Sequence, residues 1–273
     1  MNATPHLQSL HVYPVKSCAG YSLPRMLLTP TGLEHDREWM VIDPTGRFIT
    51  QREEPCLALV TTAIHDGRLQ LSAGGTAAIS IPLGHEGVLR EVSVWRSLVP
   101  AFDAGAEAAE FFSTWLRRPA RLVRFDARHR RLSSSEFTGS QQAANFFSDG
   151  YPLLVLSAAS LADLNARLGQ PLPMNRFRPN LVLGGVAAYA EDASTQLQID
   201  AVALRLVKAC TRCVITTTNQ VSGEREGEEP LHTLKAYRYD RALQGVVFGH
   251  NAVILRGAGE HLAGGQTVQL SAR

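Results

Sequence analysis

The chain has few cysteines, no long apolar runs and no leader-like N-terminus, and each shortage excludes a class of protein. Its 273 residues include four cysteines, too few for the disulfide framework that holds small secreted domains together. No apolar stretch approaches the roughly 18 residues that a membrane-spanning helix needs. No basic segment followed by an apolar one marks a signal peptide at the N-terminus. We therefore expect a cytoplasmic protein without a membrane span.

An excess of charge of either sign is also missing. The chain has 27 basic and 25 acidic residues, a formal net charge of +2, which gives no overall attraction to nucleic acid. Nearly all the basic residues are arginines, which suit phosphate and carboxylate, although a biased genome would produce the same excess. The arginines between residues 117 and 131 lack the interleaved aromatic side chains that nucleic-acid binding favours. We expect them to form a solvated face or an anion-binding rim, with no nucleic-acid partner.

Short, strand-like segments bounded by turn residues fill most of the chain. The first six are Leu7–Tyr13, Ser22–Leu28, Trp39–Asp43, Leu57–Ile64, Leu69–Ser72 and Leu89–Trp95. The later six are Leu181–Leu183, Gln196–Ile199, Ala203–Val207, Val214–Thr218, Ala252–Arg256 and Thr267–Leu270. Strands in this succession, without a helix between each pair, favour a barrel or a sandwich over a parallel α/β sheet.

Two segments have helical periodicity instead. Glu107–Leu116 is one, and its apolar face consists of Ala108, Phe111, Phe112 and Trp115. Ser160–Leu168 is the other, with Ser160 as the N-cap and Asp163 at the third helical position. Between them, the polar segment Arg128–Ser140 predicts a linker or a mobile loop. The expected fold class is mainly β (α+β), with a few peripheral helices.

The most informative segment is Lys208–Asn219, which contains Cys210 and Cys213 in a Cys-x-x-Cys arrangement. This spacing occurs in zinc sites, in dithiol redox sites and in plain structural cores. A zinc site normally has a second ligand pair at a matching spacing, and Cys18 and Cys56 do not supply one. The zinc interpretation is therefore disfavoured.

The residues that follow Cys213 bear on the other two interpretations. A redox-active pair precedes a helix, whereas the β-branched run Val214–Thr218 favours a strand. Two small buried residues near the start of a strand are the structural alternative. Arg212 lies next to Cys213 in the sequence, and an adjacent cation favours the thiolate, the form that binds a soft metal.

Two basic segments have the character of anion sites. Lys16 and Ser17 follow a predicted strand and precede a glycine, so an ammonium and backbone amides are available to an anion. An ordinary turn would have the same residues. Arg37 lies among acidic neighbours, where a surface ion pair is the simpler interpretation.

Two further segments hold polar side chains near strand entries. In Phe177–Asn180, a proline fixes the backbone between Arg178 and Asn180, so that the arginine is held where it can bind phosphate. A loop arginine in water is the alternative. Asp149 lies in a turn rich in glycine and proline, where such a carboxylate either binds its own backbone or serves a nearby reaction centre.

Taken together, these segments resemble the MOSC family, in particular its two-domain members of the amidoxime-reducing component type and their bacterial relatives that reduce N-hydroxylated bases. The matching pieces are YPVKSCAG, GLEHDREWMVID, ITQREEPCLALV, FSDGYPLLVLSAASLADLN, RFRPNLVLGG with AYAED, and KACTRCVITTTNQVSGEREGEEPLHTLKAYR. Each piece is short, but their ordered combination is specific and covers nearly the whole chain. The resemblance implies an N-terminal β-barrel-like domain at 1–120 and a MOSC β-barrel domain at 121–273.

The resemblance also implies residue roles. Cys213 matches the thiolate that ligates molybdenum, and Asp149 matches an acidic residue beside the metal, whereas Cys210 matches a position that is not a ligand. The residues that match cofactor-binding positions are Lys16, Ser17, Arg37, Arg178, Asn180, Thr211 and Arg212. Gly150 and Tyr151 depart from the small polar residues usual in the family, so we expect a different shape of the substrate pocket.

The implied function is reduction of N-hydroxylated compounds (amidoximes, hydroxylamines and N-hydroxylated bases) with a molybdenum–molybdopterin cofactor. The nitrogen-bound oxygen leaves as water, with protons from Asp149 or from water on the metal. The alternative function, from another class, is a sulfur-carrier or cofactor-delivery module in which Cys213 bears a persulfide.

The electron supply is expected to be a separate protein. Some bacterial relatives carry a C-terminal ferredoxin domain, but this chain ends at Arg273 and has no Cys-x4-Cys-x2-Cys cluster. We therefore expect a ferredoxin- or flavin-type electron-transfer partner. Arg130 and Arg131, in the predicted mobile segment, are the candidate docking residues for an acidic carrier.

Overall fold

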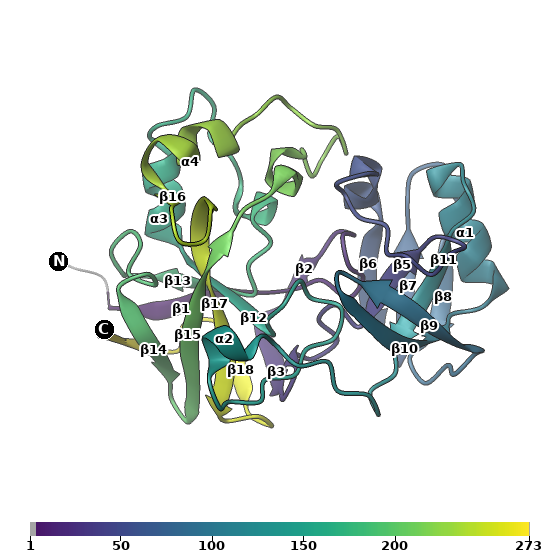
Figure 1. The fold of residues 1–273 in the computed structure, drawn as a ribbon, viewed down its shortest axis with the longest axis horizontal. Coiled ribbons are helices and arrows are strands. Elements are labelled where there is room, and N and C mark those ends of the chain that lie inside the picture. Colours follow the sequence, from purple (N-terminus) through teal and green to yellow (C-terminus); the bar gives the residue numbers. More distant parts are fainter. Residues whose placement is uncertain (1–3, 273) are drawn as a thin grey trace.

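Strands dominate the computed structural model, which describes residues 4–272. In that part of the chain they form one nine-stranded sheet, one four-stranded sheet and two three-stranded sheets. Figure 1 shows the large sheet and both termini on the left, with one three-stranded sheet below it, and the four-stranded sheet with the other three-stranded sheet on the right. The prediction of a mainly β fold is confirmed.

The large sheet collects strands from both ends of the chain, in the order β19-β14-β15-β17-β12-β13-β1-β2, with β16 paired to β17. Its strands are β1 (His6–Val12), β2 (Tyr21–Ser22), β12 (Leu153–Ser157), β13 (Leu181–Gly184), β14 (Ser194–Ile199), β15 (Val202–Thr211), β16 (Tyr239–Asp240), β17 (Gly245–Arg256) and β19 (Val268–Ala272). Strands β12 and β13 run parallel. The N-terminal ends of β12 and β13 therefore lie side by side, and the segments that lead into them contribute to the site described below.

A β-bulge adapts the first strand to the core. In a regular strand, residues three positions apart face opposite sides of the sheet. Leu7 and Leu10 are nevertheless both fully buried, because the pairing of β1 with β13 shifts register between Leu7 and Ser9. Val12 is buried at the end of the strand. The packed strand therefore fixes the position of Tyr13, the next residue, which lies at the site.

Most strands of the smaller sheets come from the N-terminal half, and one comes from near the C-terminus. The four-stranded sheet, in the order β5-β11-β10-β9, consists of β5 (Trp39–Ile42), β9 (Leu89–Val94), β10 (Ser97–Asp103) and β11 (Arg121–Phe125). The three-stranded sheets are β6 (Thr61–His65), β7 (Arg68–Ser72) and β8 (Ile79–Pro82), and β3 (Arg25–Thr29), β4 (Gly32–Leu33) and β18 (His261–Ala263). Helix α1 (Ala106–Leu116) confirms the predicted helix, and its apolar face packs into the core shared with β7 and β8.

Strand pairing crosses the predicted division at residue 120. Strand β1 pairs with β13 in the sheet of the C-terminal half. Strand β11, just after the division, lies between β5 and β10 in the N-terminal sheet. We retain domains 1–120 and 121–273 as a proposal for the division along the sequence.

Two predicted elements outside the site differ in the structure. The predicted strand Leu57–Ile64 begins instead as the 3-10 helix η1 (Pro55–Leu59), because a proline near the first position favours a helical start. Helix α3 spans Ala158–Asn165, and its N-cap is Ser157, whose hydroxyl accepts the Ser160 amide at 3.0 Å. Ser160 is therefore inside the helix and not its cap.

The segment predicted as a mobile loop, Arg128–Ser140, is ordered around a buried cation. It contains the short helix α2 (Ser135–Thr138). Arg131 is 8% exposed, and its guanidinium donates to the carbonyl oxygens of Phe146 (2.7 Å) and Ser148 (2.8 Å). The prediction of Arg131 as an exposed docking residue is wrong, since its charge is used to hold the neighbouring loop.

The remaining helical segments are η2 (Met174–Arg176), η3 (Val214–Thr217) and α4 (Leu231–Tyr237). No helix within residues 4–272 combines the length and hydropathy needed to cross a membrane.

Candidate functional site

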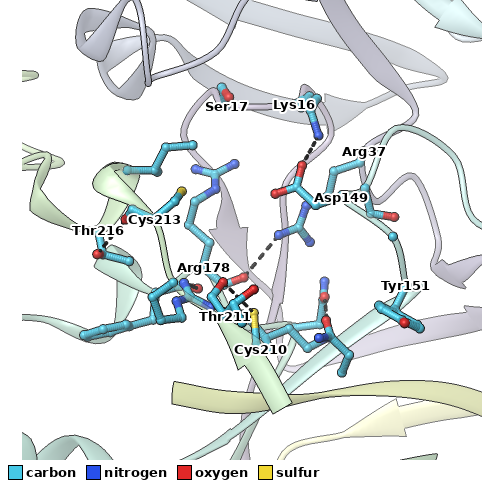
Figure 2. Close-up of a pocket in the computed structure, with 18 of the residues that line it drawn as sticks. Lys16, Ser17, Arg37, Asp149, Tyr151, Arg178, Cys210, Thr211, Cys213 and Thr216 are labelled. Carbon is cyan, nitrogen blue, oxygen red and sulfur yellow. Dashed lines mark hydrogen bonds and ion pairs between the residues drawn. The ribbon is translucent and has the colours of Figure 1, made fainter. Parts of the chain in front are cut away.

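A pocket brings together residues that are far apart in the sequence. All nine predicted site residues line it: Lys16, Ser17, Arg37, Asp149, Arg178, Asn180, Thr211, Arg212 and Cys213. Figure 2 shows Cys213 and Thr216 on one side of this pocket, and Lys16 with Asp149 on another. The residues come from both halves of the chain. Their convergence is observed, whereas their individual roles in cofactor binding stay a prediction.

The thiol of Cys213 lies two residues past the end of strand β15, at the start of η3. Arg52, from the loop between β5 and η1, places its guanidinium Nη2 at 3.2 Å from the Cys213 sulfur. The Cys213 thiol therefore lies beside a positive charge in the pocket.

The β-branched residues after Cys213 do not form the predicted strand. Val214–Thr217 is the 3-10 helix η3. The hydroxyl of Thr216 donates to the Cys213 carbonyl oxygen at 3.0 Å, and that of Thr217 donates to the Val214 carbonyl oxygen at 2.8 Å. These bonds, together with the burial of both threonines, outweigh the strand propensity. The strand preference was the reason for disfavouring a dithiol, so that reason does not hold.

Arg212 is adjacent to Cys213 in the sequence, but its guanidinium contacts the sulfur of Cys210 instead. Arg212 donates to the Cys210 sulfur at 3.0 Å and to the Phe177 carbonyl oxygen at 2.7 Å. Successive residues in extended backbone point to opposite sides, so neighbours in sequence are not neighbours in space. The positive charge at Cys213 comes from Arg52, 161 positions away.

Asp149 is held by a tight ion pair. Lys16 Nζ donates to Asp149 Oδ1 at 2.5 Å and to the Phe147 carbonyl oxygen at 2.7 Å, and Trp95 Nε1 donates to the same Oδ1 at 3.1 Å. Desolvation opposes the carboxylate charge, but the Lys16 ammonium outweighs it, with further help from Arg52, and the pKa of Asp149 falls well below its ordinary value. This carboxyl therefore stays ionised near neutral pH, as a hydrogen-bond acceptor.

Two guanidinium groups lie against one buried tyrosine ring. The guanidinium carbons of Arg37 and Arg178 are 4.3 and 4.2 Å from the centroid of Tyr13. A Cβ at Gly20 would lie 2.3 Å from this ring, so only glycine leaves room for it. Burial, with the nearby Arg37 charge, lowers the pKa of Arg178 to about 10. The stack holds two like charges close together at the pocket wall.

One end of this stack lacks a counter-charge. Arg37 pairs with Asp36 at 2.5 Å, but Arg178 donates only to the Cys18 carbonyl oxygen at 2.7 Å. The other terminal nitrogen of Arg178, Nη2, is buried with no hydrogen-bond partner. A buried, unpaired donor is costly unless a ligand satisfies it. The arrangement fits an anionic oxygen at Arg178.

The backbone around these cations is strained. Ser17, Arg37 and Arg178 have φ angles of 68°, 50° and 53°, in the left-handed region that non-glycine residues rarely adopt. Such residues concentrate at ligand sites, because the surrounding structure maintains a conformation that the chain alone disfavours. All three line the same pocket.

The two remaining predicted residues, Asn180 and Thr211, differ in whether their side chains already form hydrogen bonds within the protein. The side chain of Asn180 accepts the Leu154 amide at 3.1 Å and donates to the His11 carbonyl oxygen at 3.2 Å, so it ties β12 to β1. Thr211 is exposed at the end of β15. Asn180 is therefore a structural bridge in the pocket wall, whereas Thr211 faces the opening.

The lining suits an anionic group that carries a metal. It contains five basic side chains, Lys16, Arg37, Arg52, Arg178 and Arg212, against the one carboxylate of Asp149. Two thiols, those of Cys210 and Cys213, are also in the lining. Among residues 4–272, no three or more His, Cys, Asp and Glu side chains are grouped to hold a metal ion. A phosphate-bearing cofactor fits the unpaired guanidinium donor and the soft sulfur ligand.

Sequence reasoning missed three residues of this site, namely Tyr13, Arg52 and Trp95. Tyr13 and Arg52 fall within segments that resemble the MOSC family, but nothing in the local pattern of charge or hydropathy distinguishes them from other residues there. Trp95 lies in the turn directly after β9, and its half-exposed ring stacks on Arg52 with 4.6 Å between ring centroid and guanidinium carbon. These contacts are long-range, so only the fold reveals them.

Comparison with known proteins gives a consistent set of matches. Residues 4–119 match the MOSC N-terminal beta barrel domain, and residues 142–269 match the MOSC domain. Mitochondrial amidoxime-reducing component 1 of Mus musculus is 39% identical over 84% of this chain and 70% of its own length. Mitochondrial amidoxime reducing component 2 of Bos taurus is 37% identical over 85% and 72%. Molybdenum cofactor sulfurase of Oryza sativa subsp. japonica is 33% identical over 95% of this chain and 34% of its own length.

Proposed function

The chain belongs to the MOSC family, with a MOSC N-terminal β-barrel domain and a MOSC domain, and from this we propose that it is a molybdenum-cofactor-dependent reductase of N-hydroxylated compounds. The substrates in this proposal are amidoximes, hydroxylamines and N-hydroxylated bases. The N–O bond breaks as two electrons and two protons are taken up; one proton goes to the nitrogen, and the other goes to the departing hydroxyl, which leaves as water.

One observation carries the proposal. A thiol in contact with a guanidinium, Cys213 with Arg52, opens into the same pocket as the unpaired donor of Arg178. The thiol supplies a soft ligand, and the cationic wall supplies an anchor for a cofactor phosphate. Relatives named for amidoxime reduction, 37–39% identical over most of the chain, support this choice of chemistry.

Each residue has a task that follows from its surroundings. Cys213 would hold the molybdenum, and Lys16, Ser17, Arg37, Arg178, Thr211 and Arg212 would bind the pterin and its phosphate. The bound cofactor supplies the two-electron redox chemistry. Asp149, ionised and facing the opening with a side chain 60% exposed, would accept a hydrogen bond from an N–H group of the substrate.

The same ion pair bears on proton delivery. An ionised carboxylate accepts protons but has none to give, so Asp149 donates only after it has first been protonated from solvent. The Nζ atom of Lys16, whose pKa is lowered by burial, lies 2.5 Å from Asp149 Oδ1. We propose that Asp149 relays a proton between Lys16 or solvent and the departing oxygen.

We also propose a separate ferredoxin- or flavin-type protein as the electron donor. The docking surface does not include Arg131, because that side chain is buried. The four cysteines are free thiols, which supports a reducing compartment, and we propose the cytoplasm. The animal relatives are named as mitochondrial proteins, so fractionation of the native host is the measurement that assigns the compartment.

A second candidate function uses the same thiol. The similarity to a molybdenum cofactor sulfurase over 95% of this chain favours a role for Cys213 as a persulfide carrier. The two candidates differ in what Cys213 binds, since one predicts molybdenum with pterin and the other predicts labile sulfur without metal.

Activity of a cysteine variant tests the proposed reductase. We expect the purified protein to reduce an amidoxime or a hydroxylamine anaerobically with reduced viologen as electron donor. Cys213→Ala should reduce this activity to background, because the metal loses its protein ligand. Cys56→Ala is the matched control, since that cysteine is half-buried outside the pocket. Full activity of Cys213→Ala would exclude the proposed mechanism.

A further inference from the structure

Arg52 contacts three groups of the site that come from three different parts of the chain. Its Nη2 is 3.2 Å from the Cys213 sulfur and 3.8 Å from Asp149 Oδ2, and its guanidinium carbon is 4.6 Å from the Trp95 ring centroid. Arg52 therefore lies between the thiol and the carboxylate of the pocket.

The position of this guanidinium is fixed from several sides. Trp95 stacks against it and also donates to Asp149 Oδ1 at 3.1 Å. The backbone of Arg52 is held as well, since its amide donates to the Thr50 hydroxyl at 3.1 Å and its carbonyl oxygen accepts from Arg225. With both its backbone and its guanidinium held, the side chain is preorganised and loses little freedom when a ligand binds.

The Arg52 guanidinium lies between the Cys213 sulfur and the Asp149 carboxylate, and both groups interact favourably with a positive charge. The Asp149 carboxylate carries a negative charge, and the Cys213 sulfur lies in the same pocket. The Arg52 guanidinium donates to the Cys213 sulfur and forms an ion pair with Asp149, so it bridges the two groups. Arg212, the other candidate for this task, donates to Cys210 and Phe177 instead.

We propose that Arg52 is a positioning residue, which holds the Cys213 sulfur and the Asp149 carboxylate in one fixed arrangement and supplies the positive charge at the sulfur. Its effect on a bound cofactor rests on the proposed function, whereas its effect on the free thiol does not. Groups that orient and polarise a metal ligand in this way affect metal retention by about 10–100-fold when they are removed.

The charge at the sulfur is measured first on the full chain expressed without molybdate. Cys213 is modified with an anionic dicarboxylate disulfide and with an uncharged dipyridyl disulfide at one pH, and each cysteine is followed by peptide mass spectrometry. The ratio of the two rates reports local charge and cancels the reactivity of the thiol itself. Arg52→Gln should lower this ratio at Cys213 on the order of fivefold, the factor for one unit charge about 4 Å away in a water-like medium.

Three controls accompany this variant. Cys210 in the same sample should change less, because its cation is Arg212. Arg52→Lys keeps the charge and should restore most of the ratio. Arg47→Gln, which removes a surface arginine paired with Glu53 at 2.7 Å, should leave the ratio unchanged. Unfolding curves identify any variant that fails to fold. If Arg52→Gln does not fold, the rate ratio of Arg52→Lys decides whether the positive charge at this position acts on Cys213.

The second measurement uses protein loaded with molybdenum and pterin. Arg52→Gln should retain the metal about 10–100-fold less tightly than wild type. A lower rate ratio in a protein that never takes up molybdenum would support the role of Arg52 and exclude the proposed reductase. Normal metal loading with both the ratio and the retention unchanged in Arg52→Gln would overturn the role of Arg52 and leave the reductase intact.

Discussion

At the scale of single residues, the site depends on charges whose partners are specific. Lys16 is buried, and its ammonium is satisfied by Asp149 and by the Phe147 carbonyl oxygen. Arg178 is partly buried, and its buried Nη2 has no hydrogen-bond partner. Lys16 therefore already has a charged acceptor within the chain, whereas Arg178 has a donor available to a ligand.

Replacement of Asp149 by asparagine tests the ion pair. We expect Asp149→Asn to lower the free energy of unfolding by about 1–3 kcal/mol, because the buried Lys16 ammonium loses its charged acceptor. Glu53→Gln is the matched control, since Glu53 pairs with Arg47 on the surface and both side chains are exposed; a smaller loss is expected there. Urea unfolding at neutral pH measures both, and equal losses would contradict the assigned role of the pair.

The pH dependence of this stabilisation has a defined sign. The pKa of Asp149 is lower in the folded protein than in the unfolded chain, where it is about 3.9. Its contribution to stability is therefore fully present above that value and is lost as the pH falls through the folded pKa. The difference in stability between wild type and Asp149→Asn should stay constant from about pH 5 to 8. A difference that shrinks within this range would show that the carboxyl titrates there.

At the scale of elements, a helix or strand could be predicted from the sequence where tertiary contacts agree with its local secondary-structure preference. The helix at Glu107–Leu116 and the strands at Leu69–Ser72 and Leu89–Trp95 were predictable, because each has one clear period and one buried face. Val214–Thr218 was not, because threonine hydroxyls bond to nearby carbonyl groups and stabilise a 3-10 turn. Strand β8 (Ile79–Pro82) alternates buried and more exposed residues but is only four residues long, and it was missed.

The turn after Cys213 is itself testable. Thr216→Val keeps the shape of the side chain but removes the hydroxyl that donates to the Cys213 carbonyl oxygen at 3.0 Å. We expect a loss of about 1 kcal/mol in the free energy of unfolding, together with weaker retention of molybdenum, since the turn that presents the thiol loosens. Thr61→Val, at an exposed position of β6, is the control. Unchanged stability and retention in Thr216→Val would show that the turn is held by burial alone.

At the scale of the whole molecule, the site exists only where both halves of the chain meet. Lys16, Arg37 and Arg52 come from the N-terminal half, and Asp149 and Cys213 come from the C-terminal half. The ordered set of family-like segments indicated which residues would converge. It did not indicate which of them would touch, because the contact of Arg52 with Cys213 joins residues 161 positions apart and depends on how two sheets pack.

The exchange of strands between the halves predicts that neither folds well alone. Fragment 121–273 lacks β1, which pairs with β13, and fragment 1–120 lacks β11, which lies between β5 and β10. We expect both fragments to lose the cooperative thermal transition of the full chain, followed by circular dichroism. Fragment 1–126 restores β11 and should unfold more cooperatively than fragment 1–120. A sharp transition for fragment 121–273 would contradict the structural role of β1.

The most direct test of the central claim is to determine whether Cys213 binds molybdenum or sulfur in protein expressed with molybdate. Metal and pterin analysis of the purified wild type should give stoichiometric molybdenum with pterin, and Cys213→Ser should lose the molybdenum while Cys56→Ser keeps it. Wild-type protein that is free of molybdenum and carries labile sulfur on Cys213 would contradict the reductase and support the persulfide carrier.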